Sequence, residues 1–407
     1  MIGGTDMHPF MKADILLPEN VSMEQWSVIA CDQFASQPEY WSQARQLAGD
    51  APSTLNLILP ESELDGDCNT AIQKINETMQ QYLNNRIFRT YTDCFIYVER
   101  TLLNGAVRKG VVGAVDLDQY DFHPQSNAAI RATEETVAER IPPRMNIRRN
   151  APLELPHVLL LCDDDEKLLV ESLTAKKDTL PLLYDFELML GGGRIRGWLV
   201  AGADGEAFSQ QLDAYGKRMV KRYGENGVMY AVGDGNHSLA SAKGCYEENR
   251  ANENARYALV ELENIHDEAQ VFEPIHRIIK HTDAKALLTS MESSIGKESG
   301  SPVIWHIGQE SGTFYVHDQQ GNLPVGIVQS FLDEYLTSHP GVIDYIHGED
   351  ALQQLAQEEN AIGLILPPVE KNAFFQGILA GGTLPRKTFS MGHAQEKRYY
   401  LEARKIK

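Results

Sequence analysis

The chain has 407 residues, 43% of them hydrophobic and 23% charged, which is typical of a folded globular protein of two or three domains. With 57 acidic and 37 basic residues its net charge is -20, and a chain this acidic repels nucleic acid unless a long basic patch compensates. We find no such patch, so a nucleic-acid partner is not expected. The sequence has no run of about 18 apolar residues and no signal-peptide pattern. Its five cysteines do not have the spacing of a disulfide framework. We therefore expect a cytoplasmic protein without a membrane span.

The first half of the chain alternates short apolar runs, which predict strands, with apolar residues at helical spacing, which predict helices. In chain order we expect strands within 13–34, a helix at 38–48, a strand at 55–61, a helix at 68–91, a hairpin at 95–117, strands at 156–164 and 194–201, and a helix at 206–224. The dipeptide Asn104-Gly105 favours the hairpin turn. Because hairpins and helices both connect these strands, the sheet is expected to be mixed.

In the second half, a strand at 228–233 leads through a glycine-rich turn into a helix at 238–249. The polar end of the segment 281–300 is the expected domain boundary, and short strands and helices alternate beyond it. The predicted fold is therefore α/β or α+β. It has a larger N-terminal domain, residues 1–290, with a mixed sheet and flanking helices, and a smaller α/β C-terminal domain, residues 291–407.

The most informative local feature is the turn Gly233-Asp234-Gly235-Asn236-His237-Ser238. Glycines allow positive φ and close approach of a ligand, and unpaired N–H groups at a helix start favour phosphate. Asp234 could hold a metal or act as a base, and His237 could donate to phosphate or carry a proton. A tight turn in which Asn236 or Ser238 merely caps the helix would have the same pattern.

A second candidate is the charged segment 130–149, which contains these residues: Arg131, Glu134, Glu135, Glu139, Arg140, Arg144, Arg148 and Arg149. Arginine can grip phosphate and carboxylates can bind metal. On residues alone we favour a solvated helix face with ion pairs such as Arg131 with Glu135. Pro142-Pro143 should end any helix there and place Arg144 on a loop or on the next element.

Two shorter elements, Pro274-Ile275-His276-Arg277 and Pro385-Arg386-Lys387-Thr388, could face a site, or could be a sheet edge and a basic loop. The remaining histidines lack metal-ligand spacing, so no metal site is predicted from them. The segment 191–197, GGGRIRG, lacks the P-loop and Rossmann patterns, and no nucleophile elbow is present.

Taken in order, these motifs resemble the bacterial and archaeal family called domain of unknown function 1015. Its D-G-H-H-R turn corresponds to Asp234-Gly235-Asn236-His237-Ser238, and its H-E-x-T segment with a later arginine to Thr133-Glu134-Glu135-Thr136 with Arg144. Its P-x-H-R and P-x-K-[ST] elements correspond to the two shorter elements above. The match extends along nearly the whole chain. It departs from the family pattern at Thr133, Pro143, Asn236 and Ser238, so roles that need the usual residues there are in doubt.

The turn by itself is similar to that of the ParB and sulfiredoxin superfamily, which includes free-serine kinases, so residues 1–290 could contain a portion of that kind. This resemblance implies a nucleotide or phosphorylated small molecule as ligand, with Mg²⁺ and ATP or ADP as the corresponding cofactors. Together with the motif positions of the first family, it implies catalytic roles for Asp234, Glu134 and His237. The implied phosphate-binding residues are Gly233, Gly235, Asn236, Ser238, Thr136, Arg144, His276, Arg277 and Lys387.

Two functions follow from these expectations. The first is an enzyme of phosphoryl transfer, such as a small-molecule kinase, acting at the strand–turn–helix loop. The second is a non-catalytic ligand-sensing or scaffold protein, because Asn236 and Ser238 replace more reactive residues of the family. DNA binding by analogy with ParB is disfavoured by the net charge, and the sequence indicates no oligomeric state.

Overall fold

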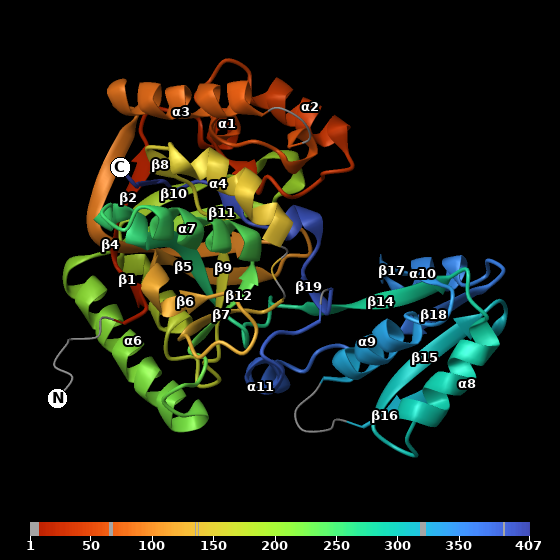
Figure 1. Ribbon diagram of the computed structural model, residues 1–407. Coiled ribbons are helices and arrows are strands. Elements are labelled where there is room, and N and C mark those ends of the chain that lie inside the picture. Colours follow the sequence, from red (N-terminus) through yellow and green to blue (C-terminus); the bar gives the residue numbers. More distant parts are fainter. Residues whose placement is uncertain (1–7, 65–67, 135, 137, 318–322, 386) are drawn as a thin grey trace. The chain divides into compact units, whose positions relative to one another are not determined.

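The computed structural model in Figure 1 describes residues 8–64, 68–134, 136, 138–317, 323–385 and 387–407. The chain forms two compact units. Unit 1 comprises Met1–Ala132, Thr136–Gln270 and His393–Lys407, and unit 2 comprises Thr133–Glu135 and Val271–Gly392. The expected domain boundary at residue 290 lies inside helix α8 (Ala284–Ile295) of unit 2.

Unit 1 is built on a mixed sheet, as predicted, with eleven strands among the described residues. The strand order is β10 (Leu182–Glu187), β11 (Arg194–Val200), β4 (Phe88–Thr101), β5 (Val107–Asp116), β13 (Tyr257–Asn264), β9 (Leu159–Cys162), β12 (Tyr230–Asp234), β7 (Ile130–Ala132) and β6 (Tyr120–Asp121), with β1 (Phe10–Met11) beside β5 and β2 (Ala13–Pro18) beside β4. The pairs β13–β9, β12–β7 and β6–β7 are parallel, and the others are antiparallel. The predicted hairpin is confirmed, because Thr101 pairs with Val107 across the turn at Asn104-Gly105.

Helices cover both faces of this sheet. The helices of unit 1 are α1 (Met23–Trp26), α2 (Pro38–Ala48), α3 (Asn69–Asn84), α4 (Ile141–Arg149), α5 (Val170–Thr174), α6 (Gly202–Tyr223) and α7 (Asn236–Glu248). Helix α6 lies along one face (Figure 1) and buries Phe208, Leu212, Tyr215 and Met219, whose spacing places them on one side of a helix. The expected strand at 55–61 is wrong, because Thr54–Leu57 is a 3₁₀ turn whose start is capped by the Ser53 side chain.

The last residues of the chain return to unit 1. Strand β20 (Tyr399–Tyr400) pairs with β3 (Val28–Ile29), and β21 (Arg404–Lys405) pairs with β8 (Leu153–Glu154). These two-residue pairings give few hydrogen bonds, so other contacts must hold the segment. The buried Arg398 side chain supplies them, since its Nε lies 2.8 Å from Glu261 of β13 and its Nη1 donates to the Pro156 carbonyl.

A second buried arginine holds the same segment by its backbone. Arg100, on β4, donates to the carbonyl oxygens of Gln395, Glu396 and Lys397 and to that of Gly192. Burial, and then the neighbouring Arg108, lower the pKa of Arg100 to about 9. The C-terminal segment therefore rests on buried cationic hydrogen-bond donors, whose removal would leave several carbonyl groups without partners.

Unit 2 contains a six-stranded sheet among its described residues. Its order is β16 (Glu310–Val316), β15 (Ser301–Ile307), β18 (Ala361–Ile365), β14 (Phe272–Lys280) and β17 (Val342–His347), with β19 (Phe389–Met391) on the first residues of β14. All of these pairs are antiparallel. The helices of the unit are α8, α9 (Pro324–Tyr335), α10 (Glu349–Leu355) and α11 (Lys371–Gly381). The mixed α/β class expected for the chain is thus confirmed.

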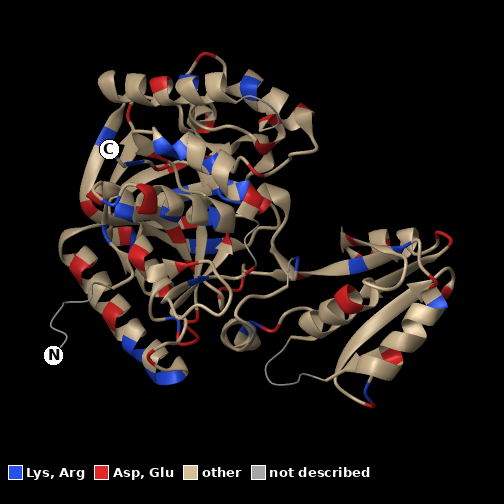
Figure 2. Ribbon diagram, in the orientation of Figure 1, with Lys and Arg blue, Asp and Glu red and all other residues tan. Residues whose placement is uncertain are grey.

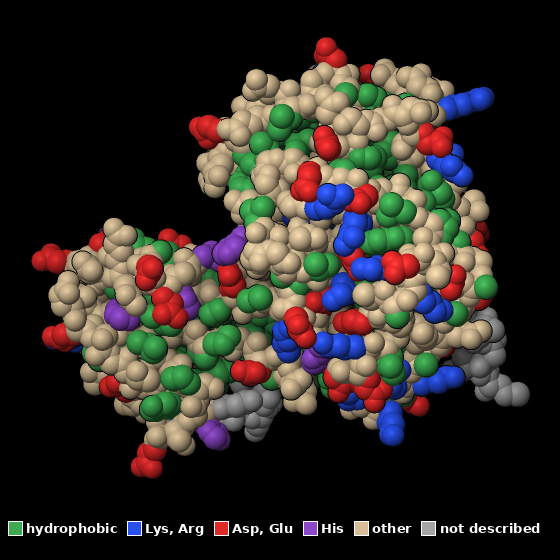
Figure 3. Space-filling model, turned by 180° about the vertical axis from the view of Figure 1, so that it is seen from behind, with side chains coloured by type: hydrophobic (Ala, Val, Ile, Leu, Met, Phe, Trp, Pro, Cys, Tyr) green, Lys and Arg blue, Asp and Glu red, His purple; other side chains and the backbone are tan. Residues whose placement is uncertain are grey.

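Charges are mixed on the surface. Figure 2 shows acidic and basic side chains interspersed along the helices of unit 1, and the face presented in Figure 3 likewise carries both signs close together. Within the part of the chain that the structure describes, each helix is too short or too polar to traverse a lipid bilayer.

The buried network beneath the C-terminal segment predicts a pH effect on stability. Burial raises the pKa of Glu263, on β13, to about 8, although Arg108 lies 2.9 Å away and opposes the shift. The folded chain therefore binds a proton that the unfolded chain, with an ordinary pKa near 4.5, has released. This contribution is complete below the unfolded pKa and is lost as the pH rises through about 8.

We expect the free energy of unfolding to fall between pH 5 and pH 8 more steeply in the wild type than in Glu263→Gln. The slopes of the two proteins should differ by about 1.4 kcal/mol per pH unit in the range where Glu263 is ionised in the unfolded chain and protonated in the folded chain. Urea unfolding at several pH values measures it, with the exposed Glu77→Gln as control. Equal slopes in wild type and Glu263→Gln would contradict the prediction.

Candidate functional site

The glycine turn lies where β12, an inner strand of the large sheet, leads into α7. The strand continues to Asp234, and α7 begins at Asn236, two residues earlier than expected. Gly235 lies between them in the left-handed region, with φ 80° and ψ 25°. A Cβ atom there would approach Val158 Cα to 3.1 Å, so both the backbone angle and the close strand favour glycine. Gly233 belongs to the strand and is not among the described glycines with positive φ.

Helix α7 starts without a side-chain cap. The N-cap residue is Gly235, so neither Asn236 nor Ser238 caps the helix. The first N–H groups of an α-helix have no acceptor within the helix and point out along its axis. The helix has 13 residues, and its dipole adds to the attraction of an anion at this end. Residues 233–238 are all partly exposed, so a ligand can reach them.

Asp234 faces a lysine from the returning C-terminal segment. Lys397 Nζ lies 3.7 Å from Asp234 Oδ1, and the side chains are 11% and 17% exposed. Among the described residues, Asp234 Oδ2 and Asn236 Oδ1 are buried without a hydrogen-bond partner. Buried acceptor oxygens without donors are costly, so these two atoms are suited to receive a donor or a cation from a ligand.

Asp32 and His157 complete the charged surroundings of the turn. Burial works to raise the pKa of Asp32, but attraction to His157, the hydrogen bond from Gln33 and the charge of Lys397 outweigh it and lower this pKa. Burial lowers the pKa of His157, against the opposing charges of Asp32 and Asp234. The Asp32 carboxyl group therefore loses its proton more readily, and the His157 imidazole binds one less readily, than the free side chains.

Tyr400, His157 and Cys31 form a hydrogen-bonded cluster near the turn. The Tyr400 hydroxyl lies 2.9 Å from His157 Nδ1 and 3.1 Å from Cys31 Sγ, and it accepts from the Cys31 backbone N–H at 3.2 Å. Burial raises the pKa of the Cys31 thiol to about 12. A thiol that stays protonated is a poor nucleophile, so Cys31 contributes polarity and shape.

Arg144 lies on α4, which packs against α7 (Figure 1). The two prolines stand in the first turn of α4, where proline is well tolerated, so Arg144 is helical. Its Nη2 lies 3.1 Å from Glu61 Oε1, and its Nη1 donates to the Arg140 carbonyl. The segment 130–149 is not one solvated helix face, because Arg131 is buried on β7 and donates to backbone carbonyls of Ala128 and Asn226. Its expected partner Glu135 lies outside the described residues.

The other predicted site residues belong to unit 2, apart from Thr136 in unit 1, whose hydroxyl has no hydrogen-bond partner among the described residues. Glu134 forms an isolated bridge with Leu384, and the ring of His276 accepts from the Leu366 N–H. Arg277 is fully buried and donates to Gln329, to the Ile275 carbonyl and to the Lys387 carbonyl.

Burial lowers the pKa of Arg277 to about 10, and its guanidinium lies over the Tyr345 ring at 4.6 Å. These contacts make Arg277 an internal support for the loop at Lys387, which is itself exposed with φ 57°. Glu134, Arg277 and Lys387 are thus neighbours within unit 2, whereas Asp234, His237 and Arg144 belong to unit 1.

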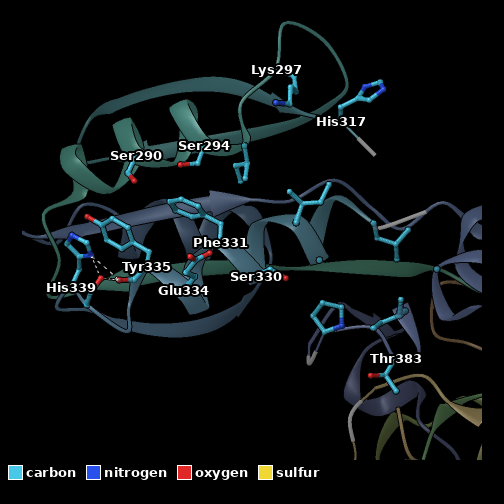
Figure 4. Close-up of a pocket in the computed structure, with 18 residues that line it drawn as sticks. Ser290, Ser294, Lys297, His317, Ser330, Phe331, Glu334, Tyr335, His339 and Thr383 are labelled. Atoms are coloured by element: carbon cyan, nitrogen blue, oxygen red, sulfur yellow. Dashed lines mark hydrogen bonds between the residues drawn. The ribbon is translucent and has the colours of Figure 1, made fainter. Parts of the chain in front are cut away.

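Unit 2 also contains a groove of about 820 Å³ between α8 and α9 (Figure 4). Ser290 and Ser294 of α8 face Phe331 and Tyr335 of α9 across it. His339 hydrogen-bonds to the Tyr335 carbonyl at one end. Its lining includes Pro385 but none of the predicted site residues.

Sequence reasoning missed Asp32, His157 and Lys397. Each follows or precedes a short apolar run and has no motif spacing that singles it out. His157 and Lys397 come close to Asp234, and Asp32 comes close to both of them, because β9, β3 and the C-terminal segment converge there through long-range pairing.

The fold and the turn define a two-unit α/β protein with an uncapped helix start at the end of an inner strand. A model of the family described as protein of unknown function (DUF1015) matches residues 9–405, and the chain belongs to that family. No curated protein matches the sequence.

Several solved structures are similar over most of their length. SbnI with a C-terminal truncation, from Staphylococcus aureus, has 11% identity and a TM-score of 0.36, covering 69% of this chain and 81% of its own. A mutant free serine kinase in complex with AMP has 13% identity and a TM-score of 0.35, covering 70% and 91%. A conserved hypothetical protein from Pyrococcus furiosus has 12% identity and a TM-score of 0.33, covering 71% and 90%.

The geometry of the turn predicts a specific cost for one methyl group. Gly235→Ala should destabilise unit 1 through both the left-handed backbone, about 1–2 kcal/mol, and the contact with Val158. Gly105→Ala is the matched control, because Gly105 also has a positive φ but a methyl group added there would meet nothing within 4 Å. Denaturant unfolding should show the larger loss for Gly235→Ala. Equal losses would mean that close approach to Val158 is not a constraint.

Proposed function

We propose that unit 1 binds the phosphate groups of a nucleotide or a phosphorylated small molecule at the N-terminus of α7. The observation that carries this proposal is the uncapped helix start behind left-handed Gly235, with the ammonium group of Lys397 beside it. Backbone N–H groups at a helix start and an adjacent cation are a common combination for phosphate. His237 and Ser238, in the first turn, add side-chain donors to the same end.

Mg²⁺ fits the same site as a partner of the phosphate. Mg²⁺ prefers hard oxygen ligands and is commonly held by one or two carboxylates together with substrate phosphates. Asp234 Oδ2 and Asn236 Oδ1 are oxygen atoms of this kind, buried and without partners among the described residues. When bound, the ion would neutralise charge on the phosphates.

A small-molecule kinase or another phosphoryl-transfer enzyme is the activity that this arrangement supports best. Such reactions depend on positioning and on electrostatic stabilisation more than on covalent chemistry. Lys397 and the helix start would hold the phosphate, and Asp234 would act as metal ligand or base. The roles of Glu134, Thr136, His276 and Lys387 stay predictions from the sequence, whereas Arg277 is buried and supports the loop at Lys387.

Removing the lysine charge should weaken phosphate binding. We expect Lys397→Ala to lower the affinity for Mg-ADP about tenfold or more, because a charge-assisted hydrogen bond contributes about 1.5–3 kcal/mol. Isothermal titration calorimetry with the full chain measures it. Lys405→Ala, an exposed lysine of the same C-terminal segment, is the matched control and should bind like the wild type.

Absence of binding by folded wild-type protein to ATP, ADP, CTP and inorganic phosphate, with and without Mg²⁺, would overturn the proposal. An equal loss of affinity in Lys397→Ala and Lys405→Ala would instead show that general charge, and not the site, attracts the ligand.

The acidic side of the site predicts a metal effect. In the wild type Mg²⁺ should raise the affinity for ADP, whereas in Asp234→Asn this increase should be lost, since the amide is a weaker ligand for the ion. Titrations of ADP with and without Mg²⁺ test this, with exposed Asp50→Asn as control.

If Mg²⁺ raised the affinity for ADP equally in the wild type and in Asp234→Asn, Asp234 would not be a ligand of the metal ion. Nucleotide binding without turnover of any phosphoryl acceptor would favour the ligand-sensing alternative. Sustained turnover that Asp234→Asn abolishes would exclude it.

A further inference from the structure

A small cavity adjoins the turn within unit 1. Its volume is about 120 Å³, and Ser238 and Ser241 of α7 line it together with Arg144 of α4. A 150 Å³ apolar cavity accommodates benzene, so this space suits a group of about five carbon atoms. It is too small for a nucleoside, because pockets for ligands of that size span about 300 Å³ or more.

The walls of the cavity differ at its two sides. One part of the wall is aliphatic, contributed by these residues: Leu57, Ile58, Leu59, Met79, Ile147, Ala151, Leu153 and Leu155. The side chains of Arg148 and Glu154 also line the cavity, but they neutralise each other in an ion pair of 2.5 Å. The rest of the wall is polar, with the Cys31 thiol, the His157 ring, the hydroxyl groups of Ser238, Ser241 and Tyr400, and the guanidinium of Arg144. The aliphatic part of the wall suits a hydrocarbon chain, because an unpaired charge buried there would be costly.

Arg144 supplies a positive charge at the same cavity. Its side chain is 16% exposed, and it makes an ion pair with Glu61 and a hydrogen bond to the Arg140 carbonyl. A guanidinium has five N–H donors, so these contacts leave capacity for a second carboxylate. The positive charge of Arg144 and the aliphatic wall together favour a ligand with an acidic group at one end and a short hydrocarbon chain at the other.

We propose that this cavity is a subsite for a short aliphatic carboxylate, whose chain lies among the leucines and whose carboxylate contacts Arg144. The inference rests on the proposed function, because it makes this compound the neighbour of the phosphate bound at α7. The shared wall residue Ser238 belongs to both the helix start and the cavity.

The test uses straight-chain carboxylates from acetate to decanoate as probes on the full chain. Protein labelled with ¹³C at the methionine methyl groups reports binding through Met79, whose resonance is assigned with Met79→Leu. We expect affinity to rise up to about fourfold for each added methylene as far as hexanoate, and to level off or fall for longer chains. No chain-length dependence, or no response of Met79, would overturn the inference.

Two variants change the cavity in opposite directions. Ala151→Leu should fill it and abolish the binding of hexanoate, whereas Ala203→Leu, at an exposed position on α6, should leave binding unchanged. Ile147→Ala removes three carbon atoms from the wall and should move the preferred chain length two or three carbons upward. A preferred length that is the same in wild type and Ile147→Ala would contradict the assignment even if Ala151→Leu failed to fold.

Mg-ADP titrations on the same samples separate this inference from the proposed function. Binding of Mg-ADP without any carboxylate response overturns the subsite alone. A carboxylate response that follows chain length, in a protein that binds no phosphate compound, supports the cavity assignment and overturns the proposed function.

Discussion

The docking of the C-terminal segment onto the large sheet is the constraint on which the site of unit 1 depends. Arg398 joins this segment to Glu261 of β13, and Arg100 of β4 holds its backbone carbonyls. Both arginines are buried. Breaking a buried ion pair by removing one partner costs about 3–5 kcal/mol, so the segment is firmly held despite its short strands. Its position brings Lys397 to Asp234 and Tyr400 to His157.

The turn itself depends on packing as well as on local geometry. Gly235 allows the chain to change direction within one residue, and the nearby Val158 backbone leaves no room for a side chain. Because the N-cap position is a glycine, no side chain caps the start of α7. The charges around it are mixed, with Asp32 and Asp234 opposing Lys397, so the phosphate of the proposed function would bind there together with a metal ion and not as a bare anion.

Much of the architecture could be predicted from local patterns. The hairpin β4–β5 followed from two apolar runs around Asn104-Gly105, and α6 from apolar residues on one helical face. The apolar run at 55–61 was expected to form a strand, but Thr54–Leu57 forms a 3₁₀ turn. Arg277 was expected at a ligand, yet its hydrogen bonds go to Gln329 and backbone carbonyls within unit 2. A buried arginine and a ligand-binding arginine have the same sequence signal.

By itself the sequence determined the mixed α/β class and the strand–turn–helix element at Asp234, since these depend on hydrophobic periodicity and on residues close in the chain. Only the tertiary structure decided that Asp32, His157 and Lys397 surround that turn, and that residues 393–407 belong to unit 1. The physical reason is that such convergence comes from pairing between distant strands and from the burial of charges with distant partners, which leave no periodic pattern along the chain.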